Sequence, residues 1–395
     1  MSSRFGICFQ AVALAIIRPY YWTVYRIRSW GRLPWRRGAT LMVCNHQHDL
    51  DTVATIVQAS NDGPWNKPVY SAGSRRMFEP GFMAIRVPWL RSYLRRFDST
   101  KLFGAMGILP IENELRTRSL ASLAWAVYAS HGEVPLTKVV SSDVIAQLDP
   151  QAASTTVGQL FGERWFKRAQ GTRVSVKTVL EPYRSEIYAH TRQHLEPDYQ
   201  LLESTLRAGT TMFLTPEGRY SQDGRMYPLR SALMRLLPLA HEIYLLAISY
   251  DVFVGSRLSC LFRILPLPDR RDLDVWMRAT RPITASQLLS AWLFERSLSS
   301  FSRIEATEAV ASRLQSLPPS AFVDPELRKR PGRVASAALD GLLRLGALEE
   351  RSGEFALTSK RRHPQFPLVK DMVAYQSRFF GETIDALECL AGTRM

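Results

Sequence analysis

Residues 45–51 read NHQHDLD and follow the apolar run TLMVC. A histidine can act as a general base when a carboxylate holds its ring in the tautomer that leaves the outer nitrogen basic. His46 and Asp51 have suitable types for this chemistry, and a chain that turns between them brings the carboxylate back towards the ring. Asp49 or Asp51 can equally be a helix N-cap. This stretch alone therefore supports proton transfer and helix capping equally.

A metal site is the third interpretation of the same stretch. His46 and His48 alternate along an extended chain, so both could approach one ion, and metallo-β-lactamase-type hydrolases carry a related HxHxDH run. Here an aspartate stands where that run ends in histidine, and the register differs. A zinc site needs three or four ligands, and among the other histidines only His190 and His194 share helical spacing. We therefore expect no metal, and we assign His48 to the start of a helix or to solvent.

A second group of polar residues follows another apolar run, in FLTPEGRYSQDGRM (residues 213–226). Pro216, Glu217 and Gly218 come directly after a predicted strand. In α/β proteins the carboxyl ends of strands are where ligands bind. Asp223-Gly224 is also a strong turn dipeptide, so an ordinary strand-to-helix turn is the alternative.

Together these blocks resemble the glycerolipid acyltransferase family, which includes lysophosphatidate and glycerol-3-phosphate acyltransferases. Asn45-His46 with Asp51 fits its NHxxxxD motif, and residues 216–225 echo its FPEGTRS and Asp-Gly-Arg block. GILPI (residues 107–111) is similar to its glycine and Ile/Pro-rich strand, and Leu-Ala-Ile (residues 246–248) to its last strand. The blocks keep the family's order over residues 18 to about 252, with an insertion at about 131–200.

The resemblance implies an α/β fold, with a mixed sheet flanked by helices, and an O-acyltransferase activity. It makes His46 the general base and Asp51 the residue that orients it. No serine or cysteine nucleophile is needed. The residues that it assigns to substrate binding are Asn45, Gly107, Pro110, Glu217, Gly218, Arg219, Ser221 and Arg225.

The implied donor is acyl-CoA or acyl carrier protein, as a co-substrate, and no cofactor is expected. The implied acceptor is a hydroxyl of a lysophospholipid or glycerol phosphate. Where the family has arginine after its Ile/Pro strand and in its FPEGTRS block, this chain has Glu112, Asn113 and Tyr220. Two interpretations are open: Arg219, Arg225, or Arg75 and Arg76 bind the acceptor's phosphate instead, or the acceptor is a different hydroxyl, such as that of another lipid or a secondary metabolite.

Charge and hydropathy point to a lipid surface. The formal net charge is +15, which favours anionic partners. Residues 26–37, RIRSWGRLPWRR, mix arginine with tryptophan, as membrane interfaces do, although a solvated basic linker has a similar composition. The apolar run at residues 5–17 is too short to span a bilayer, because Arg18 and Pro19 interrupt it. We expect an interfacial helix there, or else a helix packed on the core.

These features predict a membrane-associated protein on the cytoplasmic face, with no nucleic acid as partner. The four cysteines show no CxxC spacing, which fits a reducing compartment. The alternative function is an inactive, lipid-bound scaffold, or a nucleic-acid-binding protein that uses its carboxy-terminal region.

Short apolar runs alternate with helical patterns through the first two thirds of the chain. The runs predicted as strands are residues 39–45, 68–73, 107–111, 211–216 and 243–250. The stretches predicted as helices are residues 51–59, 82–97 with a break at Pro88, 120–130, 181–196 and 230–242. This alternation is typical of an α/β sheet with helices on both faces.

Three regions are expected: a membrane-interface segment at 1–35, an acyltransferase domain at 36–285 and a mostly helical region at 286–395. Within the last, residues 334–359 predict a helix, a turn at Gly346 and a hairpin at Ser352-Gly353. That pattern resembles half of a winged helix, or else a carboxy-terminal scaffold or lid.

Overall fold

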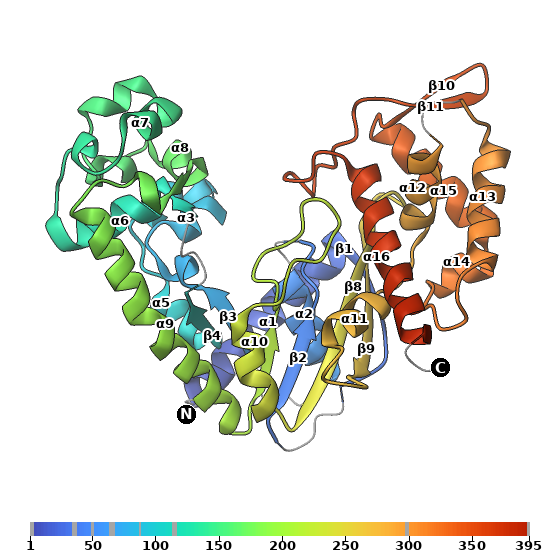
Figure 1. Ribbon diagram of the computed structural model, residues 1–395, viewed down its shortest axis with the longest axis horizontal. Helices are drawn as coiled ribbons and strands as arrows, with labels where there is room; N and C mark the ends of the chain where they lie inside the picture. Colours follow the sequence, from blue (N-terminus) through green and yellow to red (C-terminus); the bar gives the residue numbers. More distant parts are fainter. Residues whose placement is uncertain are drawn as a thin grey trace. The chain divides into compact units, whose positions relative to one another are not determined.

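The computed structural model describes residues 4–33, 38–48, 51–62, 68–86, 88–112, 117–296 and 300–392 (Figure 1). Contacts group the chain into two compact units, which we describe separately. The larger unit comprises Ala11–Val69 and Leu206–Met395, and the smaller unit comprises Met1–Gln10 and Tyr70–Thr205. The predicted division into functional regions at 1–35, 36–285 and 286–395 stays a prediction.

The main sheet has seven strands, and five of them, in the order β1-β9-β8-β2-β7, form the centre of the larger unit. All neighbouring pairs are parallel except β8 with β9, so the sheet is mixed and mostly parallel. The strands are β1 (Tyr25–Trp30), β2 (Thr40–Cys44), β7 (Thr211–Leu214), β8 (Glu242–Asp251) and β9 (Leu258–Pro266). The predicted α/β class, with a mixed sheet flanked by helices, is confirmed.

Helices cover both faces of this sheet. Every residue of β2 is buried, and so is nearly all of β8, as expected of strands that are packed on two sides. The α-helices of the unit that follow the first strand are α2 (Asp51–Asp62), α10 (Ser231–Leu236), α11 (Leu273–Ala279), α12 (Ala285–Glu295), α13 (Arg303–Gln315), α14 (Pro325–Lys329), α15 (Pro331–Arg344) and α16 (Met372–Gly392). A short 3₁₀ helix, η7 (Leu237–Leu239), continues α10.

Strand β1 excludes the linker alternative for the first part of the basic, aromatic stretch at 26–37, and its membrane-interface role stays a prediction. Its first residues are an edge strand that runs parallel to β9, and not a linker. Arg28 forms a bidentate ion pair with the buried Asp324, with both N–O distances 2.7 Å. Trp30 packs edge-on against Phe322. Trp35, Arg36 and Arg37 lie outside the described residues.

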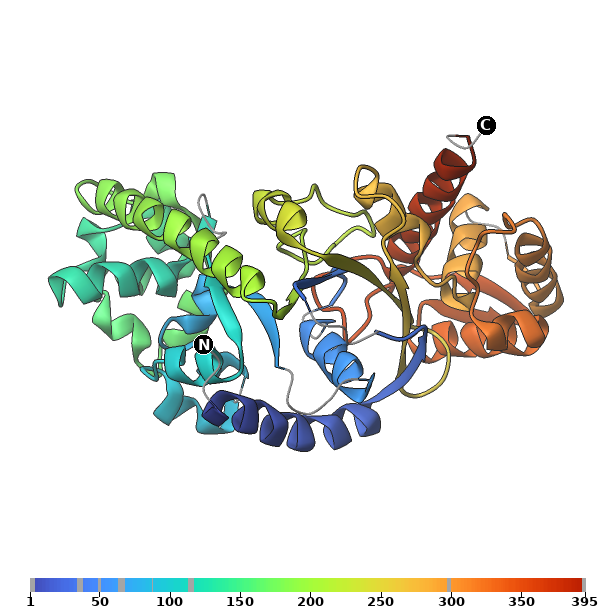
Figure 2. The ribbon, with the colours of Figure 1, turned by 90° about the horizontal axis from the view of Figure 1, so that it is seen from below.

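The first helix is longer than predicted. Helix α1 (Arg4–Val24) continues through Pro19 for five further residues, so Arg18 and Pro19 do not end it (Figure 2). Its window Gly6–Val24 has a mean hydropathy of 1.3 and is only 6% buried. By length and composition alone, α1 is therefore able to cross a membrane, which is weak evidence for an anchor or a signal sequence.

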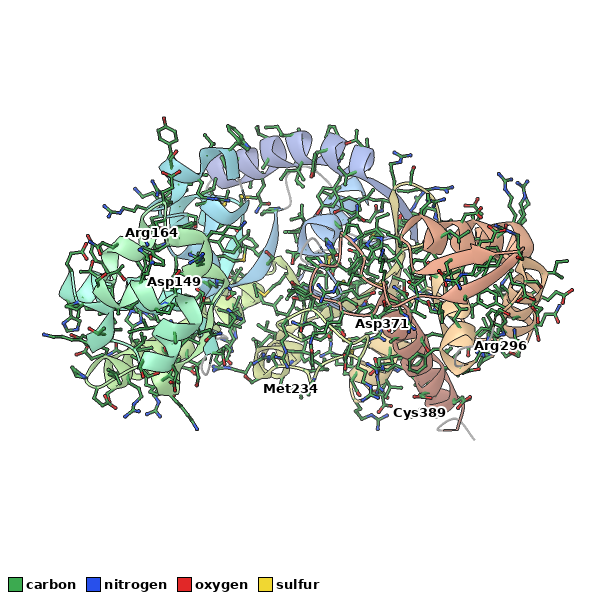
Figure 3. All side chains as sticks on the ribbon, turned by 90° about the horizontal axis from the view of Figure 1, so that it is seen from above. Asp149, Arg164, Met234, Arg296, Asp371 and Cys389 are labelled. Carbon is green, nitrogen blue, oxygen red and sulfur yellow. The ribbon has the colours of Figure 1, made fainter. Side chains whose placement is uncertain are left out.

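The smaller unit holds a parallel strand pair, β3 (Val69–Ser74) and β4 (Ile108–Ile111), and an antiparallel pair, β5 (Thr117–Ser119) and β6 (Arg173–Ser175). Its helices are η1 (Arg75–Phe78), α3 (Phe82–Arg86), η2 (Pro88–Leu90), α4 (Arg91–Leu94), α5 (Thr100–Ala105), α6 (Leu120–His131), η3 (Leu136–Lys138), α7 (Ser142–Leu148), η4 (Pro150–Ser154), η5 (Gly158–Phe161), α8 (Phe166–Gly171), η6 (Val176–Thr178) and α9 (Tyr183–Arg207). It has its own apolar core around α6 and α8. Asp149 and Arg164 lie in loops between its helices, where Asp149 pairs with Arg168 and Arg164 binds Gln151 (Figure 3).

The carboxy-terminal prediction is confirmed in its local structure. Helix α15 is followed by Gly346 at φ +70°, and then by the antiparallel hairpin of β10 (Leu348–Arg351) and β11 (Glu354–Leu357). Ser352 and Gly353 both have positive φ, as a two-residue type I′ turn requires. A methyl group at Gly341 would meet the Phe253 carbonyl oxygen at 1.8 Å, so α15 packs closely on the chain that follows β8.

Candidate functional site

Strand β2 and helix α2 position the NHQHDLD residues. His46 follows the carboxyl end of β2, and Asp51 is the first residue of α2. The chain between them turns back, so that the Nδ1 atom of His46 lies 3.0 Å from Oδ2 of Asp51. The side chain of Asp51 is fully buried, whereas that of His46 is 14% exposed.

The hydrogen bonds around Asp51 determine which nitrogen of His46 carries the proton. The Oδ2 atom accepts the backbone N–H groups of Gln47, at 2.5 Å, and His48, at 2.7 Å. An oxygen that accepts two N–H groups carries no proton, so the Nδ1 of His46 must be the donor to it. The lone pair then lies on Nε2, to which none of the described residues hydrogen-bonds.

Asp51 has a further partner that no local motif indicated. The hydroxyl of Tyr250, at the end of β8, donates to Oδ1 of Asp51. Burial is the main cause of a raised pKa at Tyr250, so this phenol stays protonated and able to donate. Asp51, a candidate N-cap of α2, therefore forms hydrogen bonds with the preceding backbone, with His46 and with Tyr250 of β8.

Asn45 and His48 hold the loop in place. The side-chain amide of Asn45 exchanges two hydrogen bonds with the backbone of Ile248, at 3.0 and 2.8 Å, which leaves it a structural partner of β8. His48 is buried and lies 2.7 Å from the carbonyl oxygen of Gln365. Its ring packs against the rings of Tyr250 and Phe366. Assigning His48 to solvent was wrong, because this apolar contact covers it.

The Pro-Glu-Gly turn reaches the same loop. Glu217 is buried, and its Oε1 atom accepts the backbone N–H of His46 at 2.8 Å. Its Oε2 atom accepts the N–H of Tyr227 at 3.1 Å. The backbone N–H of Ser221 donates to the carbonyl of His46 at 3.1 Å. Gly218 has φ +68°, a backbone conformation that favours glycine. The two sequence blocks are therefore in direct contact.

Burial dominates the electrostatics of Glu217. Burial raises the pKa of this carboxyl to about 7. The hydrogen bond from the His46 backbone and the charge of the Arg281 guanidinium lower the pKa, but by less. Arg281 is itself buried and pairs with Glu382 of α16 at 3.1 Å. Glu382 also accepts the backbone N–H of Met226 at 2.9 Å. The ion pair of Arg281 and Glu382 thus connects the Glu217 loop to α16.

Of the remaining predicted residues of the later block, Arg219 and Arg225 lie at the surface and Ser221 is buried. The Arg219 guanidinium lies 4.0 Å from the centre of the Tyr227 ring. Tyr220 packs edge-on against the His46 ring, with centroids 5.6 Å apart. Ser221 is buried and accepts the backbone N–H of Gly224 at 2.9 Å, so it shapes the loop.

Gly107 and Pro110 belong to the smaller unit, where Gly107 directly precedes β4 and Pro110 lies within it. Gly107 has φ +75°. Glu112 is buried and pairs with Arg118 at 2.7 Å. The guanidinium of Arg75 is bound to Asp198, so its charge is already neutralised within the unit. Asn113 lies outside the described residues.

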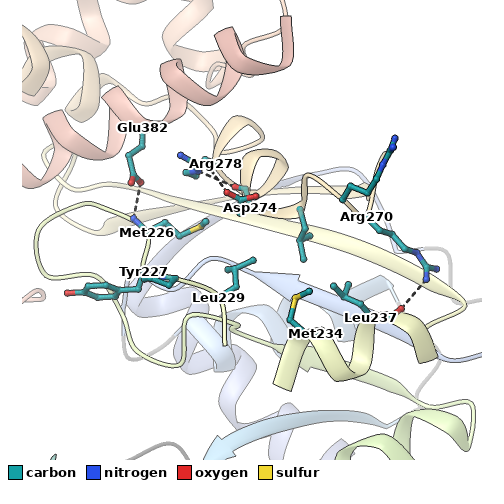
Figure 4. A pocket seen from close by; sticks show the side chains of 12 residues that line it. Met226, Tyr227, Leu229, Met234, Leu237, Arg270, Asp274, Arg278 and Glu382 are labelled. Carbon is teal, nitrogen blue, oxygen red and sulfur yellow. Dashed lines mark hydrogen bonds and ion pairs between the residues drawn. The ribbon is translucent and has the colours of Figure 1, made fainter. Parts of the chain in front are cut away.

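A pocket of about 440 Å³ lies beside the Glu217 loop in the larger unit (Figure 4). Met226 and Tyr227 line it, and their backbone N–H groups bind the carboxylates of Glu382 and Glu217, respectively. The other lining residues come from the loop after Tyr227, from α10, η7 and α16, and from α11 with the loop before it. They combine leucine side chains with Arg270, Arg271 and Arg278. His46 is not one of its lining residues.

The arrangement as a whole can accept a proton at the Nε2 atom of His46. Tyr250, Tyr227, Arg281 and Glu382 support it and were not found from the sequence, because none of them belongs to a local motif. Within the described part of the chain, no group of three or more His, Cys, Asp or Glu side chains is placed to hold a metal ion. Asp49 lies outside the described residues.

The chain matches no family model, and no curated protein matches it.

Proposed function

We propose that this protein is a membrane-associated O-acyltransferase that moves a fatty acyl group from a thioester donor to a hydroxyl group. One observation carries the proposal: an imidazole that is oriented by a buried carboxylate lies in contact with the Pro-Glu-Gly turn. The 3.0 Å pair of His46 with Asp51 and the 2.8 Å bond from the His46 backbone to Glu217 make up that arrangement. It joins the two sequence blocks that resemble the glycerolipid acyltransferases.

In the proposed reaction, Nε2 of His46 takes the proton of the acceptor hydroxyl as its oxygen attacks the thioester carbonyl carbon. The new C–O bond forms a tetrahedral intermediate, whose collapse breaks the C–S bond. The proton held by His46 then passes to the departing thiolate. Asp51 keeps the ring in the required tautomer and stabilises the imidazolium between these two steps.

The substrates of the proposed reaction follow from the resemblance and the charge. The donor is acyl-CoA or acyl carrier protein, and the acceptor is a lysophospholipid or glycerol phosphate. The exposed Arg219 and Arg225, on the loop that contacts His46, are the arginines best placed to bind an acceptor phosphate. Arg75 is a weaker candidate because Asp198 already binds it. The apolar helix α1 would hold the protein at the membrane, on its cytoplasmic face.

The test is thioester consumption by the purified full-length protein, reconstituted in anionic vesicles. Acyl-CoA and acyl carrier protein are each offered with a panel of lysophospholipids and glycerol 3-phosphate, and the product mass is measured. We expect the His46→Ala variant to lose at least about 100-fold in rate, because general-base assistance contributes about 10²–10⁴-fold.

The matched control is His241→Ala, which removes an exposed histidine directly before β8, away from the described contacts of His46. It should retain the native rate. A His46→Ala protein that is folded and still active would overturn the mechanism. A native protein that consumes no thioester with any acceptor would instead favour the inactive, lipid-bound scaffold.

A further inference from the structure

Helix α9 of the smaller unit carries two histidines one turn apart. His190 and His194 have i, i+4 spacing, so their side chains lie on the same side of the helix. Their Nε2 atoms are 3.1 Å apart, and their ring centroids are 4.4 Å apart. His190 is exposed and His194 is half-buried, so both rings are accessible from solvent.

We propose that His190 and His194 form a binding site for one divalent transition-metal ion of the Zn²⁺, Ni²⁺ and Cu²⁺ class. The distance between the two nitrogens supports this. With metal–nitrogen bonds of about 2.05 Å, a separation of 3.1 Å gives an N–metal–N angle of about 100°. That angle lies between the 90° of square-planar or octahedral sites and the roughly 109° of tetrahedral ones, so both ligands can bind one ion without a change in the helix.

The protonation of the pair favours metal binding. Burial is the main cause of a lowered pKa at both histidines, and the nearby guanidinium of Arg75 lowers both further. Metal ions bind imidazole nitrogens in their neutral form, which the direction of this shift favours. In the metal-free state one Nε2–H donates to the other Nε2. Binding requires only that this ring move its proton to Nδ1.

The surroundings decide which ions fit. Asp198 and Glu112 lie near the pair, but each is already bound to an arginine, at Arg75 and Arg118. Neither is free to become a third ligand, so water fills the remaining positions. Two imidazoles without a carboxylate suit transition metals, whereas Mg²⁺ and Ca²⁺ need oxygen ligands. We expect Cu²⁺ to bind more tightly than Ni²⁺ and Zn²⁺.

The site is independent of the proposed acyl transfer, so it is tested by binding and not by activity. The protein is used as the full chain without a polyhistidine tag. Cys8 and Cys389 are exposed thiols and are replaced by serine throughout, because they could bind the same ions. Calorimetric titration with Zn²⁺, Ni²⁺, Cu²⁺ and Mg²⁺ measures stoichiometry and affinity, and the melting temperature is recorded with and without each ion.

We expect one transition-metal ion per chain, a higher melting temperature with the ion bound, and no response to Mg²⁺. His190→Ala and His194→Ala should each weaken binding at least about tenfold, the lower end of what even supporting residues contribute to metal affinity. His131→Ala is the matched control, since His131 is paired with Glu186 at 2.6 Å and not with the two histidines. Unchanged affinity in both variants, or no binding by the parent protein, would overturn the proposal.

Discussion

Replacing Glu217 by glutamine tests the electrostatic description of the site without assuming any activity. The carboxyl is 1% exposed, and burial raises its pKa from 4.5 to about 7. The folded protein therefore holds this proton over a pH range in which the unfolded chain has lost it. Glutamine has nearly the same shape and never ionises, so the variant lacks this source of pH dependence.

The size of the effect follows from the shift. A difference of about 2.5 pKa units, at about 1.4 kcal/mol for each, corresponds to about 3–4 kcal/mol in total, of which about 3 kcal/mol falls between pH 4.5 and 8.5. Because the folded-state pKa is the higher one, this stabilisation is fully present below pH 4.5 and is lost as the pH rises through 7. The native protein should thus lose about 3 kcal/mol of unfolding free energy relative to Glu217→Gln between pH 4.5 and 8.5.

The assay is urea unfolding of both proteins across this range, followed by circular dichroism. Asp251→Asn is the matched control, since burial raises the pKa of Asp251 from 3.8 to about 6. The pH-dependent change in unfolding free energy that Asp251 causes is therefore complete at a lower pH than that of Glu217. Between pH 6.5 and 8.5 the native protein should still lose stability relative to Glu217→Gln but not relative to Asp251→Asn. Stability curves of the native protein and Glu217→Gln that stay parallel at all pH values would refute the reasoning.

Three further substitutions test the packing around the site, each by thermal and urea unfolding. Gly224→Ala should cost at least about 2 kcal/mol, because φ is +91° and the new methyl would meet a carbonyl oxygen of α16 at 2.1 Å; native stability would contradict that packing. Tyr250→Phe should cost about 1–3 kcal/mol, since it removes the hydroxyl that donates to the buried Asp51. Arg28→Ala should cost about 3 kcal/mol by leaving the buried Asp324 unpaired, and the double variant with Asp324→Ala should recover part of that loss.

The elements with strong local signals were predictable. The apolar runs that became β2, β7 and β8 were found because a strand buried on both faces is apolar throughout its length. The hairpin at Ser352-Gly353 was found because a type I′ turn needs residues that tolerate positive φ. In contrast, β1 was missed because arginines occupy alternate positions in it. Pro19 did not end α1, although a proline within an apolar run indicates a helix end.

The sequence by itself determined the residue types of the candidate site and placed each block at the carboxyl end of a strand. Only the tertiary structure decided how the blocks meet. Glu217 binds the His46 backbone from 171 positions away, and Tyr250 binds Asp51 from 199 positions away. The physical reason is the sheet: β7 and β8 both pair with β2 in parallel, so their carboxyl ends lie beside that of β2 however far apart they are along the chain.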